Sequence, residues 1–352
     1  MKQGINVKWL LAGAGDIANR RVADALSRAE NSELVAVCDP VTEKAVSLAR
    51  RMNVPEIWSD YEEALARTEA DAVYIAAPAQ FHVPMCRKAL KAGKHLLCEK
   101  PLALNPEECS DLCEDLKNAS RGQISSCSNY RLFTSQFRKT RELIGNGSIG
   151  TLLGGWAHDE ETVWNPGGHP LLKGNGSSPL LQFGFYLIDI ARELFGMPEQ
   201  VFASMHSFNP SGRKQYDIED LQNVLLRFPG GKQFTILINT TADHLPLRHS
   251  CEFFGSSGRI LWPGCPPHFN EPILLVNSGG TAEVPGSVSG EARGVIPNWH
   301  LPMIENFVHA VLLEGTPVLC SMENAIRSTC ITDAAFRSAE SGKAETPVDF
   351  FS

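Results

Sequence analysis

Short apolar runs alternate with amphipathic segments along the first third of the chain. The runs at 7–13 and 71–77 have the length of buried strands, and residues 16–29 repeat apolar side chains at the spacing of a helix. Further elements follow in the same alternation, with strands at 33–39 and 95–99 and helices at 41–52, 60–67, 81–92 and after Pro106. Strands separated by amphipathic helices of this length are typical of βαβ units, so we predict a parallel sheet.

The pattern changes near residue 123. A predicted strand at 124–130 and a helix near 134–144 are followed by stretches rich in glycine and proline. Segments 221–228 and 232–239 flank a Pro-Gly-Gly turn, which predicts a two-stranded hairpin. Two more helices are predicted near the C-terminus, at 302–314 and 322–341. This mixture favours an α+β region with a mainly antiparallel sheet.

A glycine-rich turn joins the first predicted strand to the first helix. The segment 13–18, Gly-Ala-Gly-Asp-Ile-Ala, fits the GxGxx(G/A) pattern of dinucleotide sites. Gly13 allows the tight turn and Gly15 allows the backbone to approach a pyrophosphate. Asp16 and Ile17 open the helix, whose first N–H groups and positive dipole end favour phosphate. Turns of this kind also join strands to helices without any ligand, so the next strand is needed to decide.

That strand ends in Asp39, 21 residues after the last residue of the motif. A carboxylate here can accept hydrogen bonds from the ribose hydroxyls of an adenosine, although an Asp-Pro pair can also simply begin a turn and cap the next helix. The two features together favour a dinucleotide. Asp39 would repel a 2′-phosphate, so NAD is expected; NADP stays open because Arg20, Arg21 and Lys44 are near in sequence.

Length and composition agree with a large α/β protein of two domains. The chain has 352 residues, 43% of them hydrophobic, and the patterns predict a Rossmann dinucleotide-binding domain at 1–123 and an α+β domain with an open sheet at 124–352. The formal net charge is −8 without any basic run, so nucleic acid is not an expected partner.

Several other classes of protein are disfavoured by the same sequence. No apolar stretch approaches the roughly 20 residues of a membrane-spanning helix, and the N-terminal residues do not resemble a signal peptide, so a cytoplasmic protein is expected. The ten cysteines are scattered without a CxxC pair. We expect them to be free thiols and predict no metal site.

Three later segments, together with the glycine-rich turn, carry a resemblance to a known family. These are DAVYIAAPAQFH at 71–82, HLLCEKPLAL at 95–104 and SSPLLQFGFYLIDIARELFG at 177–196. The chain resembles the glucose–fructose oxidoreductase / inositol dehydrogenase / rhizopine catabolism family along nearly its whole length. The resemblance implies an NAD(P)-dependent oxidoreductase that transfers hydride at a hydroxyl-bearing carbon of a sugar, sugar derivative or cyclitol. It also implies a homodimer or homotetramer formed through the open sheet, whose outer face needs a partner to cover it.

The resemblance assigns roles at the cofactor side of the site. Lys100 would touch the substrate hydroxyl and the cofactor ribose, and the bond to Pro101 is often cis in the family. Glu99 belongs to the same Glu-Lys-Pro triplet and is expected to contribute to cofactor binding. The resemblance also implies that three residues of 71–82 line the nicotinamide: Ala77, Pro78 and His82. His82 can equally be a packing or capping histidine.

The chain departs from the family pattern where catalysis is expected. Many members carry Asp and His four residues apart on one helix, and the matching residues here are Gln182 and Tyr186. Four residues make about one helical turn, so both should face the same space. We predict that Tyr186 is the acid, its phenolate favoured by Lys100, and that Gln182 binds substrate. Asp189, three residues further on, is a further substrate-binding candidate.

Other substrate-binding candidates lie in the second domain. Arg131 follows Tyr130 and either binds substrate or pairs with a carboxylate. The stretches 155–178 and 261–300 are expected to be substrate loops. Their candidate groups are His158, Asp159, Glu160, Glu161, Trp164, His169, Lys173, Trp262 and Trp299.

The sequence leaves three functions open. The first is a sugar or cyclitol dehydrogenase, which the presence of Lys100 and Tyr186 favours. The second is a regulator that binds the dinucleotide without turnover. The third is a lyase or glycosidase that keeps and recycles its NAD. In each case the expected partner is a small carbohydrate-like molecule, with no nucleic acid and no membrane.

Overall fold

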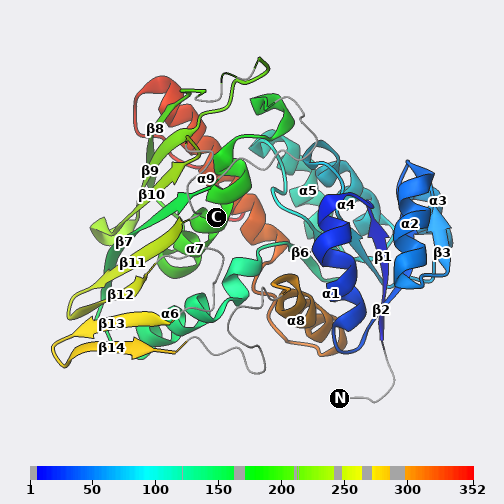
Figure 1. Cartoon of the computed structure of the whole chain (residues 1–352), viewed down its shortest axis with the longest axis horizontal. Helices are drawn as coiled ribbons and strands as arrows, with labels where there is room; N and C mark the ends of the chain where they lie inside the picture. The colour runs from blue at the N-terminus through cyan, green and yellow to red at the C-terminus, as the bar shows by residue number, and fades with distance from the viewer. Residues whose placement is uncertain are drawn as a thin grey trace. The chain divides into compact units, whose positions relative to one another are not determined.

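The chain forms two compact units in the computed structural model (Figure 1). The structure describes residues 6–120, 122–161, 171–209, 212, 214–241, 248–263, 272–285 and 298–352. The first unit contains residues Met1–Tyr130 and Asn298–Ile326, and the second contains Arg131–Pro297 and Arg327–Phe350. The division therefore lies seven residues beyond the boundary expected at 123, and a C-terminal segment returns to the first unit.

The first unit is built on a six-stranded parallel sheet in the order β3-β2-β1-β4-β5-β6. This is the strand order of the Rossmann fold, with the reversal between β1 and β4. The strands are β1 (Val7–Ala12), β2 (Ser32–Cys38), β3 (Glu56–Trp58), β4 (Ala72–Ile75), β5 (His95–Cys98) and β6 (Ser125–Cys127). The predicted parallel sheet is confirmed. Only β3 was not predicted, because three residues are too short to show a period.

Helices and a distant C-terminal segment cover this sheet. Its helices are α1 (Ala23–Arg28), α2 (Thr42–Met52), α3 (Tyr61–Arg67), α4 (His82–Lys91), α5 (Pro106–Lys117) and α8 (His300–Leu312). A π-helical turn at Ala18–Val22 precedes α1. Helix α8 packs on β1 and α1, and the Phe307 ring lies 5.1 Å from the ring of the fully buried Trp9. Residues 298–326 are therefore part of the core of the first unit.

The second unit contains an eight-stranded sheet in the order β14-β13-β12-β11-β7-β10-β9-β8. Among the described strands of this second sheet, only β7 and β10 pair in parallel. The predicted mainly antiparallel sheet is therefore confirmed. The predicted hairpin is β9 with β10. The strands are β7 (Leu152–Glu160), β8 (Gln200–His206), β9 (Leu221–Arg227), β10 (Gln233–Asn239), β11 (Arg248–Gly255), β12 (Gly258–Trp262), β13 (Ile273–Asn277) and β14 (Gly280–Val284).

One face of this sheet packs against helices, and the other carries a row of side chains that are apolar except for Thr235 and Glu252. Helices α6 (Ser135–Gly145) and α7 (Phe185–Phe195) and the later part of α9 (Met322–Ser341) contact β12, β10 and β8 respectively. On the opposite face, strand register aligns a row across seven strands: Phe202, Leu225, Thr235, Trp156, Glu252, Leu261 and Leu274. Phe202 is 45% exposed.

Two stretches that were predicted to be loops are partly strands. Residues 155–160 belong to β7, which places His158 and Asp159 on opposite faces of the sheet. Two glycines obscured this strand in the sequence. A Cβ on Gly154 would lie 2.7 Å from the Gln233 carbonyl oxygen, and one on Gly155 would lie 2.4 Å from that of Glu252. Glycine is therefore needed where neighbouring backbones approach closely.

The expected loop at 261–300 contains β13, β14 and the end of β12. Trp262, a candidate group of that loop, instead ends β12 with a buried side chain, and its indole N–H donates to Thr140 Oγ1 at 2.7 Å. No helix among the described residues is long and apolar enough to cross a membrane.

Candidate functional site

The glycine-rich turn leaves β1 at the point where the strand order reverses. Gly13 has φ +106°, and a Cβ there would lie 2.4 Å from the carbonyl oxygen of Ala76. Gly15 is different: its φ is not positive, and a Cβ there would meet no heavy atom within 4 Å. The protein itself gives no steric reason for glycine at 15. A ligand that occupies this open space supplies one, and the turn therefore fits a dinucleotide pyrophosphate.

Two side chains hold this turn. The Ala14 N–H donates to Asp39 Oδ2 at 2.8 Å, while Asp39 Oδ1 accepts from the Val41 N–H at 2.9 Å. Asn19 donates through Nδ2 to the carbonyl oxygens of Ala14 and Gly15, at 2.8 and 2.9 Å. Asp39 thus makes the turn-capping contact that the sequence left open, and its contact with ribose stays a prediction. The role of Asn19 was not predicted.

Other residues of this region are placed as the motif requires. Asp16 lies on the exposed side of the turn and forms an ion pair with Arg20, one helical turn later. Ile17 is half-buried. Arg20 pairs with Asp16, and the charged side chain directly after β2 is that of Asp39. A carboxylate in this position is consistent with the preference for NAD over NADP.

We predict that Gly15→Val lowers NAD affinity by more than about tenfold, since the added side chain enters the space intended for pyrophosphate. Stability without NAD should change by less than about 0.5 kcal/mol, because nothing is displaced. Calorimetric titration and urea unfolding measure the two effects. Gly145→Val is the matched control, because a Cβ at Gly145 also meets nothing within 4 Å; its NAD affinity should equal that of the wild type. Equal affinity in Gly15→Val would contradict this placement.

Glu99 directly follows β5 and is a buried carboxylate with three donors. The Tyr74 hydroxyl donates to Oε1 at 2.7 Å, His300 Nε2 lies 3.2 Å from the same oxygen, and the Lys100 N–H donates to Oε2 at 3.2 Å. Burial alone would raise the pKa of Glu99, but His300, Tyr74 and the Lys100 charge outweigh it and lower the pKa to about 2. Protein donors thus hold this carboxylate, and its expected contribution to cofactor binding stays a prediction. His300, 201 residues away, was not predicted.

His82 joins the two loops that follow β4 and β5. Its Nδ1 lies 2.7 Å from the Pro101 carbonyl oxygen and its Nε2 lies 2.7 Å from that of Ala77. Burial lowers the pKa of His82 despite these two carbonyls. Both ring nitrogens thus have backbone partners, as the packing interpretation expects. The Lys100–Pro101 bond is cis, as the resemblance implied. Pro78 is exposed and Ala77 and Lys100 are half-buried.

The low pKa of Glu99 makes the stability of the first unit depend on pH. The folded pKa lies below that of an unfolded glutamate, so the stabilisation is complete above the unfolded value and is lost as pH falls toward 2. We expect Glu99→Gln to lose about 3 kcal/mol at neutral pH and to show a flatter decline of stability in acid. Urea unfolding between neutral pH and about pH 3 measures both. Glu33→Gln, at an exposed carboxylate on β2, should keep the wild-type slope; a wild-type slope in Glu99→Gln would contradict the low pKa of Glu99.

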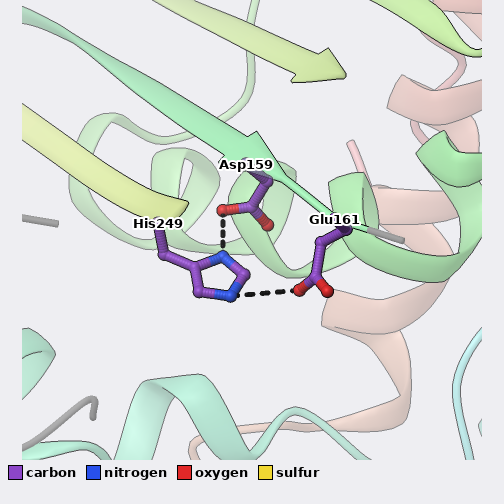
Figure 2. A group of neighbouring side chains, drawn as sticks. All are labelled: Asp159, Glu161 and His249. Carbon is purple, nitrogen blue, oxygen red and sulfur yellow. Dashed lines mark hydrogen bonds and ion pairs between the residues drawn. The ribbon is translucent and has the colours of Figure 1, made fainter. Parts of the chain in front are cut away.

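In the second unit, Arg131 lies at the centre of a buried ion-pair network. Its Nη1 donates to Asp159 Oδ2 at 2.7 Å and its Nη2 lies 3.8 Å from Glu161 Oε1. Figure 2 shows His249 between the same two carboxylates, with Nδ1 2.7 Å from Asp159 Oδ1 and Nε2 3.0 Å from Glu161 Oε1. Of the two alternatives for Arg131, the structure therefore shows the pairing with a carboxylate.

The charges of this network balance. Burial would lower the pKa of His249, but Asp159 and Glu161 raise it to about 9, so both ring nitrogens carry protons at neutral pH. Burial would raise the pKa of Asp159, but Arg131 and His249 lower it to about 2. One ligating atom of each of Asp159, Glu161 and His249 lies within 4.8 Å of the others. Two cations already neutralise the two carboxylates, so these residues form an ion-pair network and not a set of free metal ligands.

Tyr186 lies in the first turn of α7, directly after a π-helical segment at Leu180–Gly184 that contains Gln182. A Cβ on Gly184 would lie 2.6 Å from Ile238 Cδ1, so this glycine lets the segment pack against β10. Such π-helical turns are frequent at functional sites, and the other one in the described chain follows the glycine-rich turn. The Arg131 Cζ lies 4.8 Å from the centroid of the Tyr186 ring.

Asp189 has structural partners that account for its burial. Its Oδ1 accepts from Arg192 Nη2 at 2.7 Å and from Ser328 Oγ at 2.9 Å, and its side chain is 4% exposed. These contacts join α7 to α9. We therefore do not retain Asp189 in the proposed substrate site.

Four further residues were expected to contact substrate from the loops of the second domain. Lys173 forms an ion pair with Glu219, and Trp299 precedes α8 in the first unit. Trp164 and His169 lie outside the described residues.

Comparison with known proteins agrees with this architecture. Residues 7–124 match the oxidoreductase family with an NAD-binding Rossmann fold, and residues 137–261 match the GFO/IDH/MocA C-terminal domain. The chain belongs to the GFO/IDH/MocA oxidoreductase family. The resemblance inferred from the sequence is thereby confirmed, together with the NAD-binding Rossmann domain.

Individual members of the GFO/IDH/MocA family match along nearly the whole chain. An uncharacterised oxidoreductase from Rhizobium meliloti is 30% identical over 343 residues, covering 97% of this chain and 99% of its own. D-glucoside 3-dehydrogenase from Escherichia coli is 27% identical over 354 residues, with 94% and 95% covered. Among solved structures, levoglucosan dehydrogenase with NADH has a TM-score of 0.86 at 20% identity, covering 98% of this chain and 100% of that one. At this identity the likeness shows the fold alone.

Proposed function

We propose that this oxidoreductase transfers hydride between NAD and a hydroxyl-bearing carbon of a sugar, sugar derivative or cyclitol. The observation that carries the proposal is the position of Lys100 after β5, its backbone N–H bonded to Glu99, on the same carboxyl edge of the parallel sheet as the glycine-rich turn that fits a dinucleotide. The names of relatives support the substrate class, since they include D-glucoside 3-dehydrogenase.

The bound nicotinamide supplies the hydride chemistry, and the protein must orient the substrate and handle its hydroxyl proton. Lys100 binds the substrate hydroxyl and the cofactor ribose. Tyr186 accepts the hydroxyl proton during oxidation and returns it during reduction. Gln182 donates or accepts a hydrogen bond to a further substrate hydroxyl without changing charge.

Turnover of a substrate panel tests the proposal. Purified protein with NAD should reduce the cofactor in the presence of at least one member of a panel of aldoses, glucosides and inositols, followed by nicotinamide absorbance. Bound cofactor without net reduction, but with cleavage of a glycoside, would favour the lyase or glycosidase alternative. Cofactor binding without any turnover across the panel would favour the regulator.

With a substrate in hand, Tyr186→Phe and Lys100→Met should each lower kcat/KM by about 10²–10⁴, because each removes a group that acts on the reacting hydroxyl. The double variant should be little worse than the poorer single variant, since groups that act on one step are not additive. NAD affinity serves as the control for Tyr186→Phe and should stay unchanged. Near-normal turnover in Tyr186→Phe would remove Tyr186 from the mechanism.

We further propose that the mainly apolar row of side chains on the open sheet face is covered by a second copy of the chain. Phe202 is exposed and its neighbours Leu225 and Trp156 are only half-buried. Phe202→Asp combined with Leu225→Glu should halve the mass measured by sedimentation, because charges would be placed in an apolar contact. Ile57→Asp, on the exposed edge strand β3, is the control and should leave the mass unchanged. An unchanged mass in the double variant would exclude this face.

A further inference from the structure

The arginine of the buried network contacts a group on which the proposed chemistry depends. Arg131 is 3% exposed, and its guanidinium lies 4.8 Å from the Tyr186 ring centroid, within the range of a cation–π contact. We infer that Arg131 is a positioning residue for Tyr186: it fixes the phenol ring and favours its phenolate form. This inference rests on the proposed function of Tyr186, and it concerns residues of the second unit alone.

The ion pairs explain how Arg131 can be held in one place. Asp159 uses one carboxylate oxygen for Arg131 and the other for His249, so neither cation competes with the other. Glu161 contacts the second arm of the guanidinium and the second nitrogen of His249. Asp159 and Glu161 come from β7 and its end, His249 from β11 and Arg131 from the turn before α6. Two carboxylates thus hold the two arms of the guanidinium against the ring, and His249 holds both carboxylates.

A fixed cation over the ring acts differently on the two forms of tyrosine. The phenolate carries more negative charge in its ring than the phenol, so a guanidinium at the ring face stabilises the phenolate more. The neighbouring carboxylates oppose this effect, and the imidazolium of His249 compensates one of them. Within the described residues, other titratable groups near this network include His158, which interacts electrostatically with Asp159 and His249, and the Cys251 thiol, whose pKa is raised by burial. Loss of the His249 proton at about pH 9 leaves an excess negative charge that disfavours the phenolate.

The test measures the ionisation of Tyr186 directly. The chain has five tyrosines, so the tyrosinate absorbance of Tyr186 is obtained as the difference between each protein and its Tyr186→Phe derivative, titrated within the range where circular dichroism is unchanged. We expect Arg131→Met to raise the midpoint by about one pH unit, a tenfold lower phenolate fraction at a given pH. Arg131→Lys keeps the charge and should recover part of the shift.

A matched control separates this effect from simple loss of a buried ion pair. Arg192→Met, made together with Asp189→Asn so that no unpaired carboxylate is left one helical turn from Tyr186, also removes a buried arginine and its buried aspartate partner in the same unit. It should lower stability without moving the Tyr186 midpoint. If Arg131→Met is too unstable to titrate, Arg131→Lys gives the comparison, with a smaller upward shift than expected for Arg131→Met.

The possible outcomes also distinguish this inference from the proposed function. An unchanged Tyr186 midpoint in both Arg131 variants, or an equal shift in the Arg192→Met and Asp189→Asn double variant, would overturn the positioning role even if Tyr186→Phe abolishes turnover. Full turnover in Tyr186→Phe would overturn the catalytic proposal, whereas the effect of Arg131 on the absorbance titration would still be measured. Where turnover is seen, the pH profile of kcat/KM should shift with the titrated midpoint.

Discussion

The burial of the Glu99 carboxylate constrains the whole cofactor side of the first unit. A carboxylate without water needs several donors, and here they come from β4, from the chain after β5 and from α8. The requirement explains why residues 298–326, distant in sequence, belong to the first unit. It also connects the packing of α8 to the backbone of Lys100, so that the position of this lysine depends on the core as much as on its own loop.

The second unit also contains a buried carboxylate, that of Asp159, and two cations stabilise it. Asp159 lies on the helix-facing side of β7, 1% exposed, and is compensated by Arg131 and His249. Removal of either cation would leave a buried charge unpaired, which costs far more than the pair contributes. In both units, then, a carboxylate at or just after the end of a strand is held by groups from distant segments. Lys100 follows this carboxylate in the first unit, and Tyr186 contacts its arginine partner in the second.

The predictable part of the structure is the part encoded locally. The strand–helix alternation predicted the parallel sheet, and the spacing of Gly13, Gly15 and Asp39 predicted the dinucleotide turn, because these features lie within about 30 residues of each other. His249 and His300 were missed since each pairs with a residue 90 or more positions away. Strand β7 was missed because its glycines and acidic residues resemble a loop until the neighbouring strands are known. The contact of Asp189 with Ser328 was missed for a similar reason, because Ser328 lies in a helix 139 residues later.

The charges around Tyr186 suggest a physical reason for the glutamine at 182, where many family members carry aspartate. An aspartate at 182 would place a negative charge about one helical turn from the phenol, and a nearby like charge disfavours the phenolate. Such a carboxylate suits a histidine base, whose charged form is positive, but opposes a tyrosine. Glutamine removes the charge and keeps the hydrogen-bonding groups. Glutamine at 182 and the guanidinium of Arg131 therefore act in the same direction on the phenolate proposed for Tyr186.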